Sequence, residues 1–134
     1  HNPETHLIPN VLKATEERPL KVFGNDWPTP DHTCVRDYIH VVDLIEAHIS
    51  ALHHLETGKH QIINLGSGDG YSVKQVIDTA SVVVEKQIPF TEESRRAGDP
   101  AVLIASVDKA QSILGWRPTR NLESMIRDAY ESIH

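Results

Sequence analysis

Two guanidinium groups far apart in the sequence are the side chains best suited to chemistry in this chain. Arg36 lies within residues 34–42, an otherwise apolar and β-branched segment, where a long charged side chain is costly to bury unless it reaches a partner or a cleft. Arg96 lies in residues 92–100, whose charge, glycine and proline suit a binding loop. The planar fork of an arginine can hold two phosphate oxygens at once. The pair therefore indicates a diphosphate site. The structural alternative for Arg36 is an ion pair with a glutamate, and that for Arg96 is a solvated surface loop.

A glycine-rich turn at residues 64–70 offers a second candidate for phosphate binding. It follows a predicted strand and precedes a predicted helix, where a dinucleotide-binding fingerprint would lie. That fingerprint also needs an acidic residue about 20 positions further on, at the end of a second strand. Here that stretch is still helical in pattern. We interpret the turn as a structural strand-to-helix connection.

Metal binding and cysteine nucleophilicity are both disfavoured by spacing. Of the nine histidines, His53 and His54 are adjacent on a predicted helix and so face different directions, and no second pair has ligand spacing. The sequence predicts no metal site. Cys34 has no neighbouring histidine or helix terminus to lower its pKa, and it is expected to be a small buried residue.

Composition excludes several classes of partner. The net charge of −6 argues against nucleic acid and anionic membranes as partners, so any anion site must be built locally. There is no apolar run of about 20 residues, and a single cysteine cannot form an internal disulfide, which together favour a cytoplasmic setting. The 134 residues predict one domain over 1–134. Aromatic residues make up only 5%, as in a piece that buries one side against something else.

Periodicity and turn residues predict the elements that must position these groups. Ser72 and Gln75 form a capping box that opens a helix, and Asp43 and Asn121 are expected to cap two others. Ser106 or Asp108 is expected to cap a short helix that ends before Gly115. Short strands interleave with about five helices, which indicates an α/β or α+β class. The predicted strands are 20–23, 34–42 and 61–65, and the predicted helices are 9–17, 44–55, 72–85, 106–114 and 122–133.

Seven segments, in order along nearly the whole chain, resemble UDP-glucose 4-epimerases of the extended short-chain dehydrogenase/reductase superfamily. The Val-Arg-Asp-Tyr-Ile-His segment indicates the superfamily, and the Pro-Thr-Pro-Asp loop before it and Arg-Arg-Ala-Gly-Asp-Pro after it indicate the epimerases. The segments are 23–31, 33–41, 43–44, 64–68, 71–73, 95–101 and 114–116.

The resemblance implies an α/β fold in which this chain is the small carboxyl-terminal domain that grips a UDP-hexose. An amino-terminal Rossmann domain, absent from these 134 residues, would hold NAD and take a hydride from C4 of the sugar before returning it to the other face. The intact enzyme would be an isomerase and a possible homodimer. The family's Tyr-x-x-x-Lys pair is absent, since Tyr38, Tyr71 and Tyr130 each lack a lysine four positions later. The segment alone is therefore expected to have no catalytic residues.

The resemblance also implies roles for individual residues. Arg36 and Arg96 resemble the diphosphate ligands, and Asp99 resembles a hydrogen-bond acceptor for the ribose. His6 occupies a position near the diphosphate where many members have asparagine, and Leu7 lies beside it. The strand that would meet the uracil comprises Lys21, Val22 and Phe23.

Two other functions remain open from the sequence. The first is a neighbouring activity on the same scaffold: epimerisation of UDP-N-acetylhexosamine or UDP-pentose, or a nucleotide-sugar dehydratase. The second is a stand-alone nucleotide-sugar-binding module without the enzyme half. An upstream glycine fingerprint followed by Tyr-x-x-x-Lys would favour the enzyme.

Overall fold

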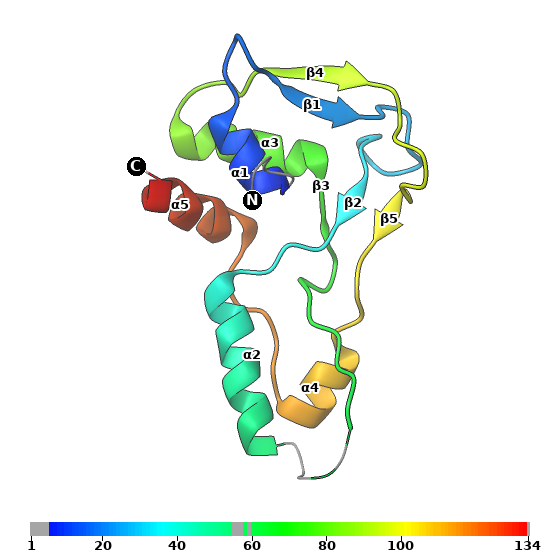
Figure 1. Cartoon of the computed structure of the whole chain (residues 1–134), viewed down its shortest axis with the longest axis vertical. Coiled ribbons are helices and arrows are strands. Elements are labelled where there is room, and N and C mark those ends of the chain that lie inside the picture. The colour runs from blue at the N-terminus through cyan, green and yellow to red at the C-terminus, as the bar shows by residue number, and fades with distance from the viewer. Residues whose placement is uncertain (1–5, 55–57, 59, 134) are drawn as a thin grey trace.

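The computed structural model describes residues 6–54, 58 and 60–133, and it has short strands interleaved with helices (Figure 1). The predicted α/β class is confirmed by this arrangement. The elements in chain order are α1 (Leu7–Lys13), β1 (Leu20–Phe23), β2 (Val35–Arg36), α2 (Val41–His54), β3 (Tyr71–Ser72), α3 (Val73–Val84), β4 (Phe90–Glu93), β5 (Val102–Leu103), α4 (Asp108–Leu114) and α5 (Leu122–Ile133).

Two apolar cores lie at opposite ends of the molecule, as Figure 1 shows. The larger core joins α1, α3, α5 and β1, and its most buried members include Val11, Val76 and Ile126. The smaller core joins α2 and α4 around Ala47 and Trp116. The strands β2, β3 and β5 run between the two ends.

Two small sheets bring distant segments together. β1 pairs in parallel with β4, with Leu20 opposite Phe90 and Phe23 opposite Glu93. β2 is the central strand of the other sheet, antiparallel to β3 and parallel to β5. Arg36 therefore sits between Tyr71 and Leu103 in the register of that sheet.

The capping box at the start of α3 is confirmed. The Ser72 hydroxyl accepts from the Gln75 amide, and the Gln75 side chain accepts from the Ser72 amide. The Asn121 cap is also confirmed, since its side-chain oxygen accepts from the Ser124 amide at 2.9 Å. Gly115 ends α4 in the left-handed conformation, as predicted. These local signals were sufficient because their partners lie within one helical turn.

Three predicted boundaries are wrong near the amino-terminal half. The first helix spans Leu7–Lys13 instead of 9–17. The predicted strand 34–42 is reduced to Val35–Arg36, and α2 already begins at Val41. Asp43 therefore lies inside the first turn and is not the cap. The ring of His40 takes that role, because its Nδ1 accepts from the Val42 amide at 3.0 Å.

Further corrections concern strands and one cap. Residues 61–65 form no strand in the structure, whereas residues 92–93, expected to be irregular, belong to β4. The residue at the start of α4 is Val107, and the Ser106 hydroxyl accepts only from the Asp108 amide. The last residue of predicted helix 44–55 lies outside the described residues.

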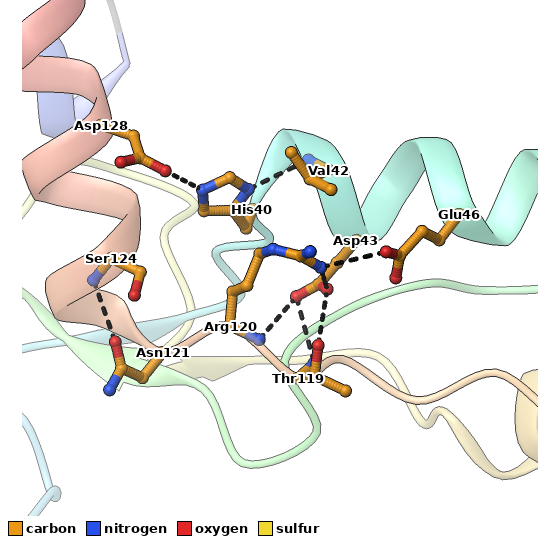
Figure 2. Close-up of polar contacts among 9 residues, drawn as sticks. All are labelled: His40, Val42, Asp43, Glu46, Thr119, Arg120, Asn121, Ser124 and Asp128. Atoms are coloured by element: carbon orange, nitrogen blue, oxygen red, sulfur yellow. Dashed lines mark hydrogen bonds and ion pairs between the residues drawn. The ribbon is translucent and has the colours of Figure 1, made fainter.

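A polar junction connects α2 to the segment that leads into α5 (Figure 2). The fully buried carboxylate of Asp43 accepts from the backbone amides of Thr119 and Arg120 and from the Arg120 guanidinium at 2.6 Å. His40 meets Asp128 of α5 through its Nε2. Since Nδ1 of His40 accepts a hydrogen bond, the neutral ring carries its proton on Nε2. The two ends of the molecule are thus connected by the hydrogen bonds of Asp43 and His40 as well as by the polypeptide backbone.

In the ranges 6–54 and 60–133, no helix is both long enough and apolar enough to cross a membrane.

Candidate functional site

A pocket of about 460 Å³ lies where α1, β1, β2, the start of α3 and the loop after β4 converge. Its size falls within the usual range for small-molecule sites. All eight residues that the resemblance assigns to substrate binding line this pocket. Among the described residues, the lining is His6, Leu7, Asn10, Leu20, Lys21, Val22, Phe23, Cys34, Arg36, Tyr38, Val73, Arg96 and Asp99.

The pocket is locally basic although the whole chain is acidic. In the part of the lining that the structure describes, Lys21, Arg36 and Arg96 contribute three cationic side chains, against a single carboxylate from Asp99. The chain as a whole carries a formal charge of −6. Such a local reversal of sign is what an anion-binding cleft requires.

Arg36 reaches the pocket from the central strand of its sheet. Within the described part of the chain its guanidinium donates to the Val35 carbonyl at 2.8 Å and pairs with no carboxylate. The alternative of a structural ion pair with a glutamate is therefore not realised there. The next residue, Asp37, turns to a different surface and accepts from the Ser67 amide and hydroxyl. The two neighbouring charges do not neutralise each other, as predicted, although Asp37 lies just beyond the end of β2.

Arg96 enters the same pocket from the loop after β4. Its Nε donates to Asp99 at 3.1 Å, and its guanidinium carbon lies 4.6 Å from the centroid of the Phe23 ring. The Arg96 side chain is 61% exposed, so neither contact locks it in a buried bridge. The two arginines thus line one crevice, and Arg96 is held at its mouth by an aromatic face and a carboxylate.

The loop between β1 and β2 is fastened to the start of α3. The carboxylate of Asp31 accepts from the Thr33 amide and hydroxyl and from the Ser72 hydroxyl. Burial alone would raise the pKa of Asp31, but these hydrogen bonds outweigh it and hold the pKa below its ordinary value of 3.8. The Thr33 hydroxyl in turn accepts from the Lys74 amide. A rigid attachment of this loop sets the position of Arg36, which follows it directly.

Tyr38 is a pocket residue that sequence reasoning missed. Burial raises the pKa of its phenol to about 12, with Cys34 adding to the rise and Arg36 opposing it. The phenol is therefore protonated at neutral pH and offers a hydrogen-bond donor. Its ring lies 6.4 Å from that of Tyr71, at 35°. Sequence reasoning also missed four other lining residues, Asn10, Leu20, Cys34 and Val73. Only Asn10 had a signal in the sequence, because it follows His6 and Leu7 at helical spacing.

Cys34 is buried, as predicted, and contributes to the pocket wall.

The glycine turn 64–70 is filled from within the chain. One carboxylate oxygen of Asp37 accepts hydrogen bonds from the amide and hydroxyl of Ser67, and its other oxygen accepts from the Ala105 amide. A Cβ at Gly66 would lie 2.7–2.8 Å from the Asp37 carboxylate atoms. Two backbone donors of the turn are thus already used, since the Ser67 amide donates to Asp37 and the Gly70 amide donates to the Ser67 hydroxyl, which supports the structural interpretation of this turn.

A wider depression of about 530 Å³ lies between α3 and the start of α5. Its described lining includes Asp78 and Glu123 and no basic side chain. It is poorly suited to an anionic ligand.

Comparison with known proteins gives a consistent result. The model of the family described as GDP-mannose 4,6 dehydratase matches residues 2–129. A UDP-glucose 4-epimerase from Corynebacterium glutamicum is 56% identical over 130 residues, which cover 95% of this chain and 40% of that protein. A UDP-glucose 4-epimerase from Streptomyces lividans is 48% identical, over 98% of this chain and 40% of that protein. The chain thus spans about 40% of the length of the curated relatives it matches.

Solved structures share the fold. The UDP-glucose 4-epimerase from Brucella ovis in complex with NAD superimposes with a TM-score of 0.89 at 41% identity, over 98% of this chain and 42% of that one. A UDP-glucose 4-epimerase from Stenotrophomonas maltophila, with bound NAD and formylated UDP-arabinopyranose, gives a TM-score of 0.89 at 37% identity, over 98% of this chain and 40% of that one.

Proposed function

Because the chain belongs to the GDP-mannose 4,6 dehydratase family, and because the relatives above are UDP-glucose 4-epimerases, we propose that it forms the UDP-sugar-binding part of an NAD-dependent UDP-glucose 4-epimerase. The single observation that carries the proposal is the basic pocket. It gathers, from separate elements of the chain, every residue that the sequence resemblance assigns to substrate binding.

In this proposal the chain binds and orients the nucleotide and leaves the sugar to the rest of the enzyme. Arg36 and Arg96 supply the hydrogen-bond donors for the two phosphoryl groups. The planar guanidinium group suits this role because its N–H groups can bind two phosphate oxygens at once. Lys21 adds a third positive charge, and Asp99 offers a carboxylate oxygen to a ribose hydroxyl. Strand β1, with Val22 and Phe23, forms the wall that would meet the uracil.

The described residues do not fit NAD. The glycine turn, the one candidate for its pyrophosphate, already encloses the Asp37 carboxylate. We propose that NAD is held by a part of the intact enzyme outside this chain, where it supplies the hydride acceptor and donor. This chain then contributes affinity and orientation to the reaction.

An exposed apolar face supports the existence of that further part. Along α2, Val41, Ile45, Ile49 and Leu52 recur at intervals of three and four residues and are 50% to 84% exposed. Ile62 is 68% exposed in the neighbouring segment that lacks a strand partner. Large apolar side chains that remain exposed along one helix face are typical of an interface. We propose that it packs against the remaining portion of the longer polypeptide, in keeping with the greater length of the relatives.

The location and oligomeric state also stay proposals. The single cysteine, Cys34, cannot form an internal disulfide and is buried, which supports a reducing, cytoplasmic setting. The homodimer expected from the resemblance would be tested by light scattering of the intact protein.

The decisive experiment uses the intact protein. Calorimetry should detect binding of UDP, and incubation with UDP-galactose should yield UDP-glucose. UDP-N-acetylglucosamine, UDP-arabinose and GDP-mannose belong in the same panel, because they separate the neighbouring activities on this scaffold. Binding of UDP without turnover of any of these sugars would favour the stand-alone binding module, and no binding of UDP would refute the proposal.

A further inference from the structure

Arg95 precedes Arg96 but contacts a different surface. Its guanidinium carbon lies 4.1 Å from the centroid of the Trp27 ring. Its Nε donates to a carboxylate oxygen of Asp26 at 2.9 Å, and its Nη2 donates to the Asp26 carbonyl at 2.8 Å. A guanidinium held by an aromatic face, a carboxylate and a carbonyl is fixed in direction as well as in place.

The loop that receives Arg95 is itself anchored. Trp27 is only 5% exposed, and its indole Nε1 donates to the Phe23 carbonyl at 3.1 Å. The amide of Gly24 donates to the Glu93 carbonyl at 2.8 Å, which continues the pairing of β1 with β4. Gly24 has a φ of +95°, and a Cβ there would overlap both the indole of Trp27 and the Arg95 side chain. The close fit of Arg95 against this loop therefore depends on glycine at position 24.

The neighbouring Arg96 depends on the same attachment. A rigid, planar peptide unit joins the two arginines, so anchoring Arg95 restricts the backbone torsions that could carry Arg96 away. Among the described residues, the Arg96 side chain otherwise contacts the half-buried ring of Phe23 and the carboxylate of Asp99, three residues further along its own loop. An exposed pair of that kind contributes little order by itself.

We propose that Arg95 is a positioning residue for the pocket. It ties the loop 94–99 to the loop 24–32 through Trp27 and Asp26, and thereby holds Arg96 over Phe23, ready to receive the diphosphate of the ligand. The identity of that ligand as a nucleoside diphosphate rests on the proposed function.

The test is a double-mutant cycle in the intact protein, with UDP as the probe and calorimetry as the readout. Arg95→Ala should weaken UDP binding by about fivefold to tenfold, a range in keeping with the loss of one cation–π contact and its hydrogen bonds. In a protein that already carries Arg96→Ala, the same change should have no further effect, because Arg95 acts through Arg96. Arg95→Lys keeps a charge for the indole and should restore part of the affinity.

The matched control is Arg127→Ala, which removes an exposed arginine that pairs with Glu123 on α5, away from the pocket. It should leave UDP affinity unchanged. Equal losses from Arg95→Ala with and without Arg96 would mean that Arg95 contacts the nucleotide itself, and unchanged affinity would mean that it has no role. Either result overturns the inference.

A ligand-free measurement separates this inference from the proposed function. Hydrogen exchange of the amides in 94–99 should be faster in Arg95→Ala than in the wild type and unchanged in Arg127→Ala. Unchanged exchange in Arg95→Ala would overturn the attachment whatever the ligand is. If hydrogen exchange in 94–99 became faster in Arg95→Ala but the wild-type protein bound no UDP, the proposed function would be overturned and the attachment would stand.

Discussion

At the scale of single residues, Arg96 shows how the pocket balances order and availability. Its Nε is engaged by Asp99 and its face rests on Phe23, yet its side chain remains 61% exposed. Exposed ion pairs contribute only about 0.2–1 kcal/mol, so a ligand with two phosphoryl groups can displace Asp99 without a large penalty. The displaced carboxylate is then available to a hydroxyl of the same ligand.

Replacing Arg96 by alanine in the intact protein should weaken UDP binding by about 1.5–3 kcal/mol, the range for hydrogen bonds to charged groups. The loss should shrink as salt is added, because the pocket mouth is open to solvent. Calorimetry at two salt concentrations measures both effects. Affinity equal to that of the wild type would remove Arg96 from the binding site.

At the scale of elements, the start of α3 and the start of α2 are each held by hydrogen bonds to a polar side chain. Ser72 both caps α3 and donates to Asp31, so one hydroxyl fixes the helix and the loop that leads to Arg36. Asp43 accepts from the segment before α5 and thereby joins the two ends of the molecule. Both contacts link segments that are far apart in the sequence.

Ser72→Ala should lower the free energy of unfolding of the chain by about 1–2 kcal/mol, because the cap and the contact with Asp31 are lost together. Urea unfolding measures the change. Ser112→Ala, at an exposed position of α4, is the control and should have almost no effect. If the two variants were equally stable, the cap at Ser72 would contribute nothing.

Asp43 predicts a dependence of stability on pH. Burial alone would raise the pKa of Asp43, but hydrogen bonds from Arg120 and Thr119 outweigh it and hold the pKa below its ordinary value of 3.8. The unfolded chain therefore binds this proton more readily than the folded one. The stabilisation is complete above pH 3.8 and is lost as the pH falls through the lower folded value.

Asp43→Asn should consequently lower the free energy of unfolding near neutral pH. It should also make that free energy fall less steeply as the pH is lowered. Unfolding free energies measured from about pH 6 down to about pH 3 would show this. The exposed Asp78→Asn is the control and should keep the slope of the wild type. A decline in Asp43→Asn as steep as that of the wild type would show that Asp43 is not the responsible group.

At the scale of the whole molecule, α2 carries a row of apolar side chains that remain exposed in the described part of the chain. Helix α2 lies beside α4 at the end of the molecule that holds the smaller core (Figure 1), and none of its residues is among the described lining of the basic pocket. Packing of a further portion of the polypeptide there would leave the basic pocket accessible to nucleotide. This arrangement agrees with a chain that supplies binding residues while another part supplies the chemistry.

We expect the exposed apolar face of α2 to make the isolated chain self-associate, and changing Ile49 and Leu52 to serine should reduce this, because two exposed apolar side chains leave the face. In the intact protein the same change should destabilise the fold by roughly 2 kcal/mol or more, since buried side chains of this size contribute about 1.5–3 kcal/mol each. Analytical ultracentrifugation and thermal unfolding measure the two effects. Val82→Ser, at a position of α3 that is 70% exposed, is the control. A destabilisation of the intact protein no larger than that from Val82→Ser would argue against an interface on α2.

The sequence by itself determined the features whose partners lie within a few residues. The capping box at Ser72, the cap at Asn121, the glycine at the end of α4 and strand β1 were all predicted, because each depends on contacts within one turn or on a short apolar pattern. Resemblance also nominated eight pocket residues, since those motifs keep their order along the chain.

Tertiary structure alone decided which extended segments became strands and which side chains shared the pocket. Residues 61–65 have a strand-like sequence but pair with no strand among the described residues, whereas residues 92–93 join β4 because β1 lies beside them. A strand needs hydrogen-bond partners from a distant segment, and no local pattern specifies where that partner will lie. For the same reason Tyr38 in the pocket and Arg95 against Trp27 became visible only once the chain had folded.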